Sequence, residues 1–503
     1  MLHRLRLSLL AAAIAAGLSG TAGAQDAPAP APDAAPATIK LTVEDCVRLA
    51  LEKNFTVQVQ RYNVANARDS LEIAKATFDP SVSLSSTRNF SQSSNTNTQL
   101  NGAPAPVSDS TNTRLGVSQE IATGGTVTVS TLLNRSSSNS SYNLLNPAYS
   151  SNVTLAVSQP LLKGAGTSIA RAAVERSQIG ITVANLNFQA QVLNVVQSTE
   201  NAYYSLVYAR EQLRVYQLSL ELAQKLLDEA QEKKRIGTAT DVDVLQAEVG
   251  VATARRNVLQ AQQSLRDGSD ALLALIGQFE LDQNIATAGF EEFSGAMPLV
   301  ASAYETALNH QPDFLAAKIA IEQSQIDVRV AKDQKLPDLS LGGALGYSGL
   351  DTSASTAYQD VPKGGSYNWQ LNLALSFPWK FRGDTARYHQ ALAALAQQQT
   401  SLRQLQQTIL VQVRSAVRSV ETNSDNVKIA AVGTDFSTKE YDLEIARFDA
   451  GLATSRDVLQ SQSDLQNARV AELQARITLQ NSISALRRLE GSSLERYHIT
   501  LAQ

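Results

Sequence analysis

The sequence predicts an α+β fold built from two copies of one pattern, in which β-strands are followed by a long helical hairpin. Three observations support this prediction. A glycine-containing turn occurs twice, long segments rich in Ala, Leu and Gln flank both copies, and stretches of alternating polarity precede each long helical segment. The hydrophobic period therefore changes from a helical one to the period of two that is typical of strands.

The duplicated turn spans residues 235–248 and 449–462, which are separated by a constant offset of about 214 residues. The identical positions are Gly237, Ala239, Thr240, Asp243, Val244, Leu245 and Gln246 in the first copy and Gly451, Ala453, Thr454, Asp457, Val458, Leu459 and Gln460 in the second. Self-similarity at a fixed separation indicates an internal repeat. We therefore divide the chain into a first repeat, 41–298, a second repeat, 299–490, and a C-terminal tail, 491–503.

The N-terminal segment, 1–24, has the three parts of a secretory signal peptide. They are a basic start (His3, Arg4 and Arg6), a short apolar core (7–18) and a small-residue cleavage site (Ala22-Gly23-Ala24). The core is shorter than the roughly 20 apolar residues that a membrane-spanning helix needs. Residues 25–40 are rich in Ala and Pro, and we expect them to form a disordered tether.

Composition excludes several classes of partner and of site. The net charge is −4, and it becomes more negative when Arg4 and Arg6 are removed with the signal peptide, which argues against nucleic acid as a partner. Cys46 is the only cysteine, so the chain has no intrachain disulfide and no Cys-rich metal site. It shares a helical face with Val43, Val47 and Ala50, which predicts a buried structural thiol.

No constellation of catalytic residues is visible in the sequence. The four histidines are scattered, and neither a phosphate-binding glycine loop with its lysine nor a His-Glu-x-x-His motif occurs. The pair Glu291-Glu292 lies in a polar connector and is interpreted as a solvated loop. We therefore expect no enzyme activity, no cofactor and no metal ion.

The first repeat begins with a predicted helix, 41–78, which Pro80 ends. Four amphipathic strands follow, at 81–91, 113–121, 127–133 and 152–161, with a tight turn at Gly124-Gly125. Each has apolar residues on one face and small polar residues on the other. A soluble sandwich and a transmembrane barrel both fit this pattern, and the long Ser- and Asn-rich loops at 91–112 and 134–152 favour the barrel.

The helical period then returns over 167–233 without a proline. Leu206, Leu213, Leu220 and Leu227 form a seven-residue repeat, which is typical of a coiled-coil seam. Such a helix is about 100 Å long at 1.5 Å per residue, which is too long for an ordinary globular domain. A second helix, 241–275, follows the turn, and 277–298 reads as an irregular connector.

The second repeat follows the same order. Its predicted elements are a helix at 299–335, which Pro337 ends, strands at 339–347 and 366–377, a long helix at 384–448, the second turn, and a helix that ends near residue 489. Tyr367, Trp369 and Trp379 near the ends of the last strand are candidate membrane-interface aromatics; packing in a core is the alternative. In each repeat, the short helix before the strands and the short helix after the turn have together about the length of the long helix. Stacked end to end, two such short helices would match one long helix, which gives a tube wall of even height.

This order of elements resembles the TolC family of outer-membrane efflux proteins. Two strand-to-helix motifs support the resemblance, Ser158-Gln159-Pro160-Leu161-Leu162-Lys163-Gly164 and the weaker Ser376-Phe377-Pro378, so Pro160, Gly164 and Pro378 are assigned to strand–helix turns. The two Gly-x-x-Thr-x-x-Asp-Val-Leu turns complete the match, in which Gly237, Thr240, Gly451 and Thr454 form the hairpin turns. The resemblance covers about 41–490.

The resemblance implies a homotrimer in which three chains build one β-barrel in outer-membrane lipid and one α-helical tunnel across the periplasm. Such a channel is the passive exit duct of a tripartite efflux or type I secretion system. A periplasmic adaptor protein and an inner-membrane transporter of RND or ABC type are the implied partners. A periplasmic or surface coiled-coil scaffold or adhesin, with its strands in a soluble sandwich, is the alternative.

The resemblance also places the hairpin turns at a closed periplasmic entrance that ring-forming acids gate. Asp457 matches one gating acid, Gln460 stands at the second gating position, and Asp243 matches a residue of the closed-state links. Asp241 in the first copy and Arg456 in the second make the two turns different. A helix N-terminal acid, stabilised by the helix dipole, is an equally weighted reading for Asp243 and Asp457.

The number of strands departs from the family pattern. Relatives usually supply four strands per chain, whereas this sequence predicts six. If all six cross the membrane, the Gly124-Gly125 turn falls on the periplasmic side and the long loops fall outside, as in other outer-membrane barrels. Because four-stranded chains are the family habit, we expect the extra hairpin, 113–134, to lie above the barrel as an extracellular extension.

Overall fold

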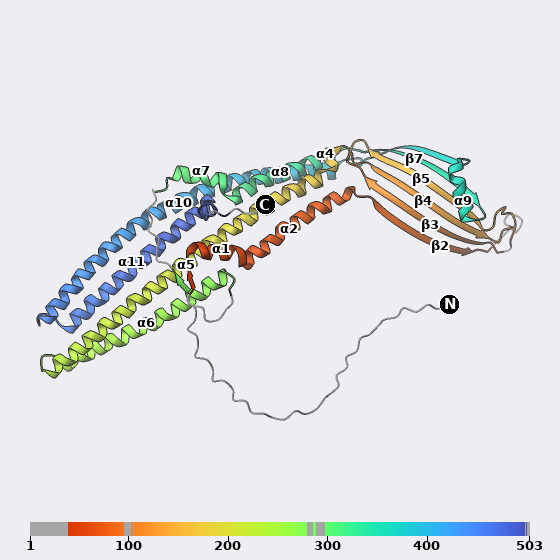
Figure 1. Ribbon diagram of the computed structural model, residues 1–503. Coiled ribbons are helices and arrows are strands. Elements are labelled where there is room, and N and C mark those ends of the chain that lie inside the picture. Colours follow the sequence, from red (N-terminus) through yellow and green to blue (C-terminus); the bar gives the residue numbers. More distant parts are fainter. Residues whose placement is uncertain are drawn as a thin grey trace, which may run out of the picture.

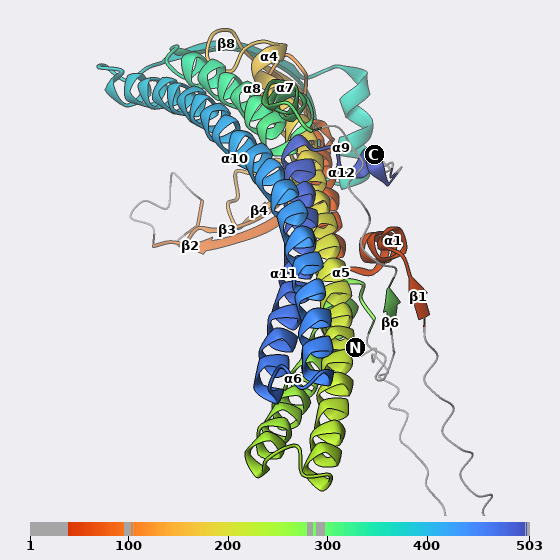
Figure 2. The ribbon, with the colours of Figure 1, turned by 90° about the vertical axis from the view of Figure 1, so that its left-hand side faces the viewer.

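The computed structural model describes residues 39–94, 102–103, 105–278, 285–287, 297–497 and 499. The signal peptide, nearly all of the tether and the Glu291-Glu292 pair lie outside these residues. The described chain is elongated, with one β-sheet at one end and the turns of two helical hairpins at the other (Figure 1). Figure 2 shows that the long helices run side by side between these ends.

The segments assigned to the two predicted repeats contain the predicted elements in order. The first comprises β1 (Ile39–Leu41), α1 (Val43–Lys53), α2 (Phe55–Lys75), η1 (Ala76–Phe78), β2 (Ser81–Gln92), β3 (Val107–Glu120), β4 (Thr126–Ser138), β5 (Ala148–Pro160), α4 (Thr167–Ala170), α5 (Ala172–Arg235), α6 (Asp241–Leu275) and β6 (Ile285–Thr287). The second comprises α7 (Val300–His310), α8 (Pro312–Asp333), β7 (Asp338–Asp351), α9 (Ala354–Asp360), η2 (Val361–Lys363), β8 (Tyr367–Ser376), α10 (Arg382–Asp449) and α11 (Ser455–Glu490), and α12 (Ser493–Arg496) lies in the tail. None of the described helices has a stretch long and apolar enough to cross a membrane.

The two predicted short helices are each interrupted, which corrects the sequence-based prediction. Asn54 separates α1 from α2 with an extended backbone, and its side chain accepts hydrogen bonds from the Thr56 and Val57 amides. Gln311 separates α7 from α8 in the same conformation because Pro312 disfavours a helical residue before it. The two breaks lie about 257 residues apart, at equivalent positions of the predicted repeat. The asparagine N-cap of α2 marks the first break, and Pro312 marks the second.

The six long strands form one antiparallel sheet in the order β2-β3-β4-β5-β7-β8. Its register aligns apolar residues across every strand in the row Val82, Val117, Val129, Leu155, Leu345 and Trp369. The adjacent row points to the other face and is small or polar: Ser83, Gly116, Ser130, Thr154, Gly346 and Asn368. The sheet therefore has one apolar and one polar face.

The expectation that the extra hairpin is a separate extension is wrong. β3 and β4 lie in the middle of the sheet, where β3 pairs with β2 along Ser81–Gln92 and β4 pairs with β5 over most of its length. Periodicity alone identified the strands, but pairing partners depend on contacts that are distant in sequence. The turn at 121–125 lies at the helical end of the sheet, and strands β2, β4 and β7 finish at its far end (Figure 1).

Several short elements were not predicted. Residues 39 and 40, at the end of the segment that was expected to be a disordered tether, lie in strand β1. β6, inside the connector that was read as irregular, pairs in parallel with β1 near the start of the chain. The short helix α9 packs on the apolar face of the sheet, where the Ser151 hydroxyl donates to the Ala357 carbonyl at 2.7 Å and Thr131 and Tyr358 share a hydrogen bond of 2.9 Å. Short segments of these lengths carry too few residues for a periodic signal.

The core lies between the helices in separate clusters rather than in one globular centre. The predicted burial of Cys46 is confirmed: it is fully inaccessible, and desolvation raises its thiol pKa to about 12. It belongs to a cluster that joins α1, α5, the end of α6 and the C-terminal tail. The Tyr497 hydroxyl of that tail donates to the buried carboxylate of Glu200 at 2.5 Å, and the Ser484 hydroxyl of α11 donates to the same carboxylate. The part of the tail that the structure describes is therefore packed against the helical region.

A glycine pair on β7 tests the packing of α9. A Cβ atom at position 349 would lie 2.0 Å from the Ala357 carbonyl oxygen, whereas a Cβ at Gly343, on the same strand and face, meets nothing within 4 Å. We expect Gly349→Ala to displace α9 and to speed proteolysis within 352–366, while Gly343→Ala leaves the cleavage rate unchanged. Equal cleavage rates in the two variants would contradict the packing described here.

Candidate functional site at the hairpin turns

The two hairpin turns have the same backbone conformation. Gly237 and Gly451 follow the ends of α5 and α10 in the left-handed conformation, with φ of 80° and 74°. In each turn the glycine N–H bonds to the carbonyl three residues back, and the next N–H bonds to the carbonyl five residues back, from Thr238 to Lys233 and from Leu452 to Arg447. This is the Schellman ending, in which glycine satisfies helix carbonyls without a Cβ penalty.

A capping box starts the second helix of each hairpin. Asp243 accepts hydrogen bonds from the Thr240 amide and hydroxyl at 2.8 and 2.7 Å, and the Thr240 hydroxyl accepts from the Asp243 amide at 3.3 Å. Thr454 and Asp457 repeat this geometry at 2.9, 2.7 and 3.3 Å. Both aspartates therefore cap α6 and α11, as one of the two readings of the sequence predicted.

The same hydrogen bonds stabilise the charged form of both carboxylates. The Thr240 hydroxyl and amide lower the pKa of Asp243, and the Thr454 amide and hydroxyl lower that of Asp457, where Arg447 and Arg456 add a smaller attraction. Asp457 is exposed, and Asp243 is partly buried. The turns consequently carry ionised acids at neutral pH.

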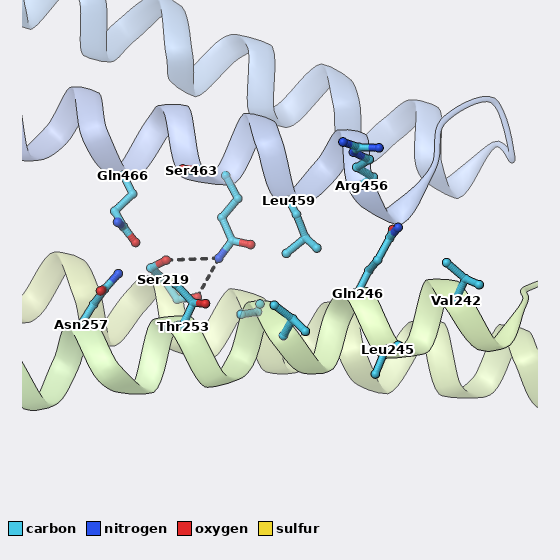
Figure 3. Close-up of a pocket in the computed structure, with 15 residues that line it drawn as sticks. Ser219, Val242, Leu245, Gln246, Thr253, Asn257, Arg456, Leu459, Ser463 and Gln466 are labelled. Atoms are coloured by element: carbon cyan, nitrogen blue, oxygen red, sulfur yellow. Dashed lines mark hydrogen bonds between the residues drawn. The ribbon is translucent and has the colours of Figure 1, made fainter.

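The remaining candidate residues distinguish the two turns. Asp241 pairs with Lys234 across the first turn at 2.5 Å, which raises the pKa of Lys234. In the second turn Gln460 donates to both carboxylate oxygens of Asp464 at 3.1 and 3.2 Å, so it faces along α11. Arg456 lies beside α6 (Figure 3). Among the described residues, no ion pair or hydrogen bond joins Asp243 to Asp457.

A contact that the sequence did not predict joins the two hairpins of one chain near their turns. The Lys233 ammonium lies 3.4 Å from the centroid of the Phe448 ring and donates to the Phe448 carbonyl at 3.3 Å. At the offset of 214 residues, Arg447 corresponds to Lys233 and Lys234 corresponds to Phe448. Comparison of the two turn sequences therefore gives no signal for this contact. Further along, Gln462 is buried and donates to the Ser219 carbonyl at 2.7 Å.

A groove of about 660 Å³ lies between α6 and α11, beside these contacts (Figure 3). Its lining is mixed, with Leu245 and Val249 from α6, Leu459 and Arg456 from α11, and Ser219 from α5. Gly250 lets Leu459 approach α6 closely, because a Cβ at position 250 would lie 2.8 Å from a Leu459 methyl group.

The predicted strand–helix turns occur where they were expected. Pro160 ends β5, and Gly164 follows it with φ of 77° while its amide donates to Asp333 at 2.7 Å. Pro378 follows β8, and Phe381 after it adopts a left-handed backbone and stacks on Phe377 with a centroid distance of 5.9 Å. Both turns lie between the sheet and the long helices.

The three candidate interface aromatics lie on and beside β8. Tyr367 and Trp369 share the exposed apolar face of this edge strand, toward its far end, so the alternative of packing in a core does not hold for them within one chain. Trp379 lies in the turn at the helical end and is 88% exposed. Their role as membrane-interface anchors stays a prediction.

Comparison with known proteins gives the family. A model described as outer membrane efflux protein matches residues 126–278 and 303–492, which is more than half of the chain. The chain belongs to this family. Members of the outer membrane efflux protein family are channel-type proteins of the outer membrane rather than enzymes, which places the chain in that membrane and does not favour the scaffold or adhesin alternative.

Individual relatives agree with this assignment. The chain is 25% identical over 310 residues to the pyoverdine export outer membrane protein OpmQ of Pseudomonas aeruginosa, covering 59% of this chain and 62% of OpmQ. It is 23% identical over 296 residues to TolC of Escherichia coli, covering 57% and 59%. Each match spans less than two thirds of the relative. The Campylobacter jejuni CmeC channel has the same fold, with a TM-score of 0.67, 19% identity and coverage of 90% and 86%.

The capping role of Asp457 is testable. Asp457→Ala removes the acceptor for the Thr454 amide, so we expect faster hydrogen exchange at the start of α11, measured by mass spectrometry. Asp464→Ala is the control, because Asp464 is exposed on the same helix and caps nothing. Equal exchange in the two variants would contradict the capping box.

The same site predicts a dependence on pH. Because the folded pKa of Asp457 lies below the ordinary value of 3.8, its stabilisation is complete above that value and is lost as the pH falls through the folded pKa. We expect protection at the start of α11 to stay constant from about pH 7 to 5 and to fall below about pH 3.8, after correction for intrinsic exchange. Asp457→Ala should abolish this pH dependence.

Proposed function

We propose that this protein is a passive exit duct, a homotrimer whose sheets close a β-barrel in the outer membrane and whose hairpins form a tunnel through the periplasm. The observation that carries the proposal is the sheet, which has an exposed apolar face and two unpaired edges and continues directly into the long helices. Family membership supports the same conclusion.

The apolar face of the sheet fits a lipid environment. Val82, Leu84, Leu371 and Leu373 are among its residues, and each is at least 65% exposed in the single chain. Apolar side chains continue along β8 from Tyr367 to Leu375 at every second position. Eight residue steps at about 3.3 Å and a tilt of about 40° give a band of about 20 Å, close to the apolar belt of outer-membrane barrels.

The edges of the sheet require a second copy of the chain. β2 and β8 are exposed along their whole length, and a bilayer offers no water to satisfy their free backbone groups. An even number of antiparallel strands puts β2 of one chain antiparallel to β8 of the next. A ring of copies therefore closes with a uniform antiparallel pattern, whatever the number of copies.

The helical region has a matching pair of uncovered surfaces. One apolar stripe lies on α6 (Val242, Leu245, Val249 and Leu259) and another on α10 (Ile429, Val432, Phe436 and Leu443), and every member is more than half exposed. Within a chain α11 packs on α5 through contacts such as Gln462 with Ser219. In the predicted repeat, α10 corresponds to α5 and α6 corresponds to α11, so the matching helix pair is α6 with α10. The stripes on α6 and α10 are therefore suited to pack against each other between neighbouring copies of the chain.

The hairpin turns would then form the periplasmic entrance. The ionised carboxylates of Asp243 and Asp457, repeated around the ring, would attract cations and repel one another. A periplasmic adaptor would dock at the tunnel end that carries these turns, with an inner-membrane transporter below. OpmQ is named for pyoverdine export and AprF of P. aeruginosa for alkaline protease secretion, so both efflux and secretion systems are candidates.

Single-channel recording tests the duct directly. We expect the purified protein to form cation-preferring pores in planar bilayers and Asp457→Asn to reduce that preference, since asparagine keeps an acceptor for the Thr454 amide but has no charge. An unchanged preference in Asp457→Asn would restrict Asp457 to the cap. A folded trimer that forms no pore at all would disprove the duct.

The uncovered stripes predict a specific assembly defect. We expect Leu259→Asp to weaken the trimer, seen as dissociation at a lower temperature in native electrophoresis, because a carboxylate would be buried in an apolar contact. Gln260→Asp adds the same charge beside the stripe and should have a smaller effect. Equal trimer stability in the two variants would show that the α6 stripe is not an interface.

A further inference from the structure

We infer that the β3–β4 hairpin is part of the membrane-spanning wall, so that each chain contributes six strands and three chains close an eighteen-stranded barrel. This inference rests on the proposed function. Its consequence is an exit about as wide as the helical tunnel, which would let bulky cargo leave through the membrane without a narrower step.

The first argument is continuity of the lipid-facing surface. Val117 of β3 and Val129 of β4 lie in the same register row as Val82 of β2 and Leu155 of β5, and all four are exposed. Their neighbours Ser118 and Thr128 point to the polar face and share a hydrogen bond of 3.1 Å. The hairpin thus has the same two faces, at the same height, as the strands on both sides of it.

The second argument is the attachment of the hairpin turn to the base of the sheet. The Gly166 amide, at the start of the first long helical segment, donates to the Thr123 carbonyl at 3.0 Å, and the Thr123 hydroxyl donates to Gln159 at 2.7 Å. Gly124 lies so close that a Cβ there would be 2.3 Å from the Gly164 carbonyl oxygen. The hairpin therefore begins at the level where β5 passes into the helices, not above the other strands.

The third argument compares the two tubes. Four helices per chain lie side by side near the sheet, because α2 packs on α5, α5 on α8, and α8 on α10. At about 9–10 Å per helix they occupy about 36–40 Å of circumference. Six strands spaced about 4.7 Å apart and tilted by about 40–45° occupy about 37–40 Å, the same arc.

Four strands would not fill that arc at an ordinary tilt. To cover about 38 Å they would have to incline by about 60°, beyond the 35–45° that is usual for outer-membrane barrels. Because barrel diameter grows roughly in proportion to strand number, removal of the hairpin from every chain would narrow the barrel by about a third. The hairpin thus supplies the width that matches the barrel to the tunnel.

Spin labels on neighbouring residues test whether the hairpin lies in lipid. We would place a nitroxide at Val117→Cys or Ser118→Cys in the full-length protein in nanodiscs, with Leu371→Cys and Gln370→Cys on β8 as the matched pair. Wild-type protein controls for labelling of Cys46, which is buried. We expect oxygen accessibility to be high and water accessibility low at Val117 and Leu371, with the reverse at Ser118 and Gln370.

A hairpin outside the wall would give water accessibility at both Val117 and Ser118 while the β8 pair still alternates, and that result would overturn the inference alone. Water accessibility at all four positions would overturn the proposed function as well, because the whole sheet would then lie outside lipid. The two failures are therefore distinguishable from one set of samples.

Excision of the hairpin provides the second test. Its two ends are adjacent, since the Val107 amide donates to Asn139 at 2.9 Å and Asn139 donates to the Ala105 carbonyl at 2.8 Å, so Pro106 can be joined to Asn139. Residues Val82 and Leu155 would stay in one row as β2 pairs with β5. We expect electron cryomicroscopy to show eighteen strands in the wild-type trimer and twelve strands, in a barrel about a third narrower, in the excised trimer. Twelve strands in the wild-type wall, with 107–138 outside it, or barrels of equal width in the two proteins, would contradict the inference.

Discussion

A sheet with free backbone groups on both edges cannot stand alone in a bilayer, and the rest of this structure is consistent with that constraint. In the proposed barrel, the hydrogen bonds that β2 and β8 lack within the chain would come from other copies, because lipid supplies none. Closure of the sheet would then set the arc that each chain occupies, and the helices attached to its strands would occupy the same arc. The exposed stripes on α6 and α10 are the helical counterpart of the two open strand edges.

The two similar turn sequences give this chain the same local structure twice, but not the same surroundings. The two capping boxes and the two Schellman endings agree within about 0.1 Å in their hydrogen bonds. Around them, Lys233 contacts Phe448, whereas the equivalent positions carry Arg447 and Lys234, two like charges. The contact between hairpins of one chain and the proposed contact between chains therefore have different chemistry, although one turn sequence underlies both.

Much of the fold could be predicted from the sequence because it is governed by local patterns. The long helices, both hairpin turns and all six long strands follow from periodicity, glycine and proline, and the capping role of Asp457 follows from Thr454 three residues before it. The break at Gln311 could have been found from Pro312, whereas the break at Asn54 depends on a side chain that caps α2 and reaches the Leu275 carbonyl. The Lys233–Phe448 contact, the place of β3 and β4 in the sheet and the docking of α9 depend on distant contacts, which no single stretch of sequence encodes.

The paired breaks at Asn54 and Gln311 have a mechanical consequence. Near Asn54 and Gln311, the long helices α5 and α10 are continuous, whereas the shorter helices beside them end and new ones begin. At this height only the long helices have an unbroken series of backbone hydrogen bonds. The proposed tunnel would therefore be less stiff to bending and twisting at this height than above or below it. Strain applied at the hairpin turns would be absorbed at this belt, and the sheet beyond it would remain undistorted.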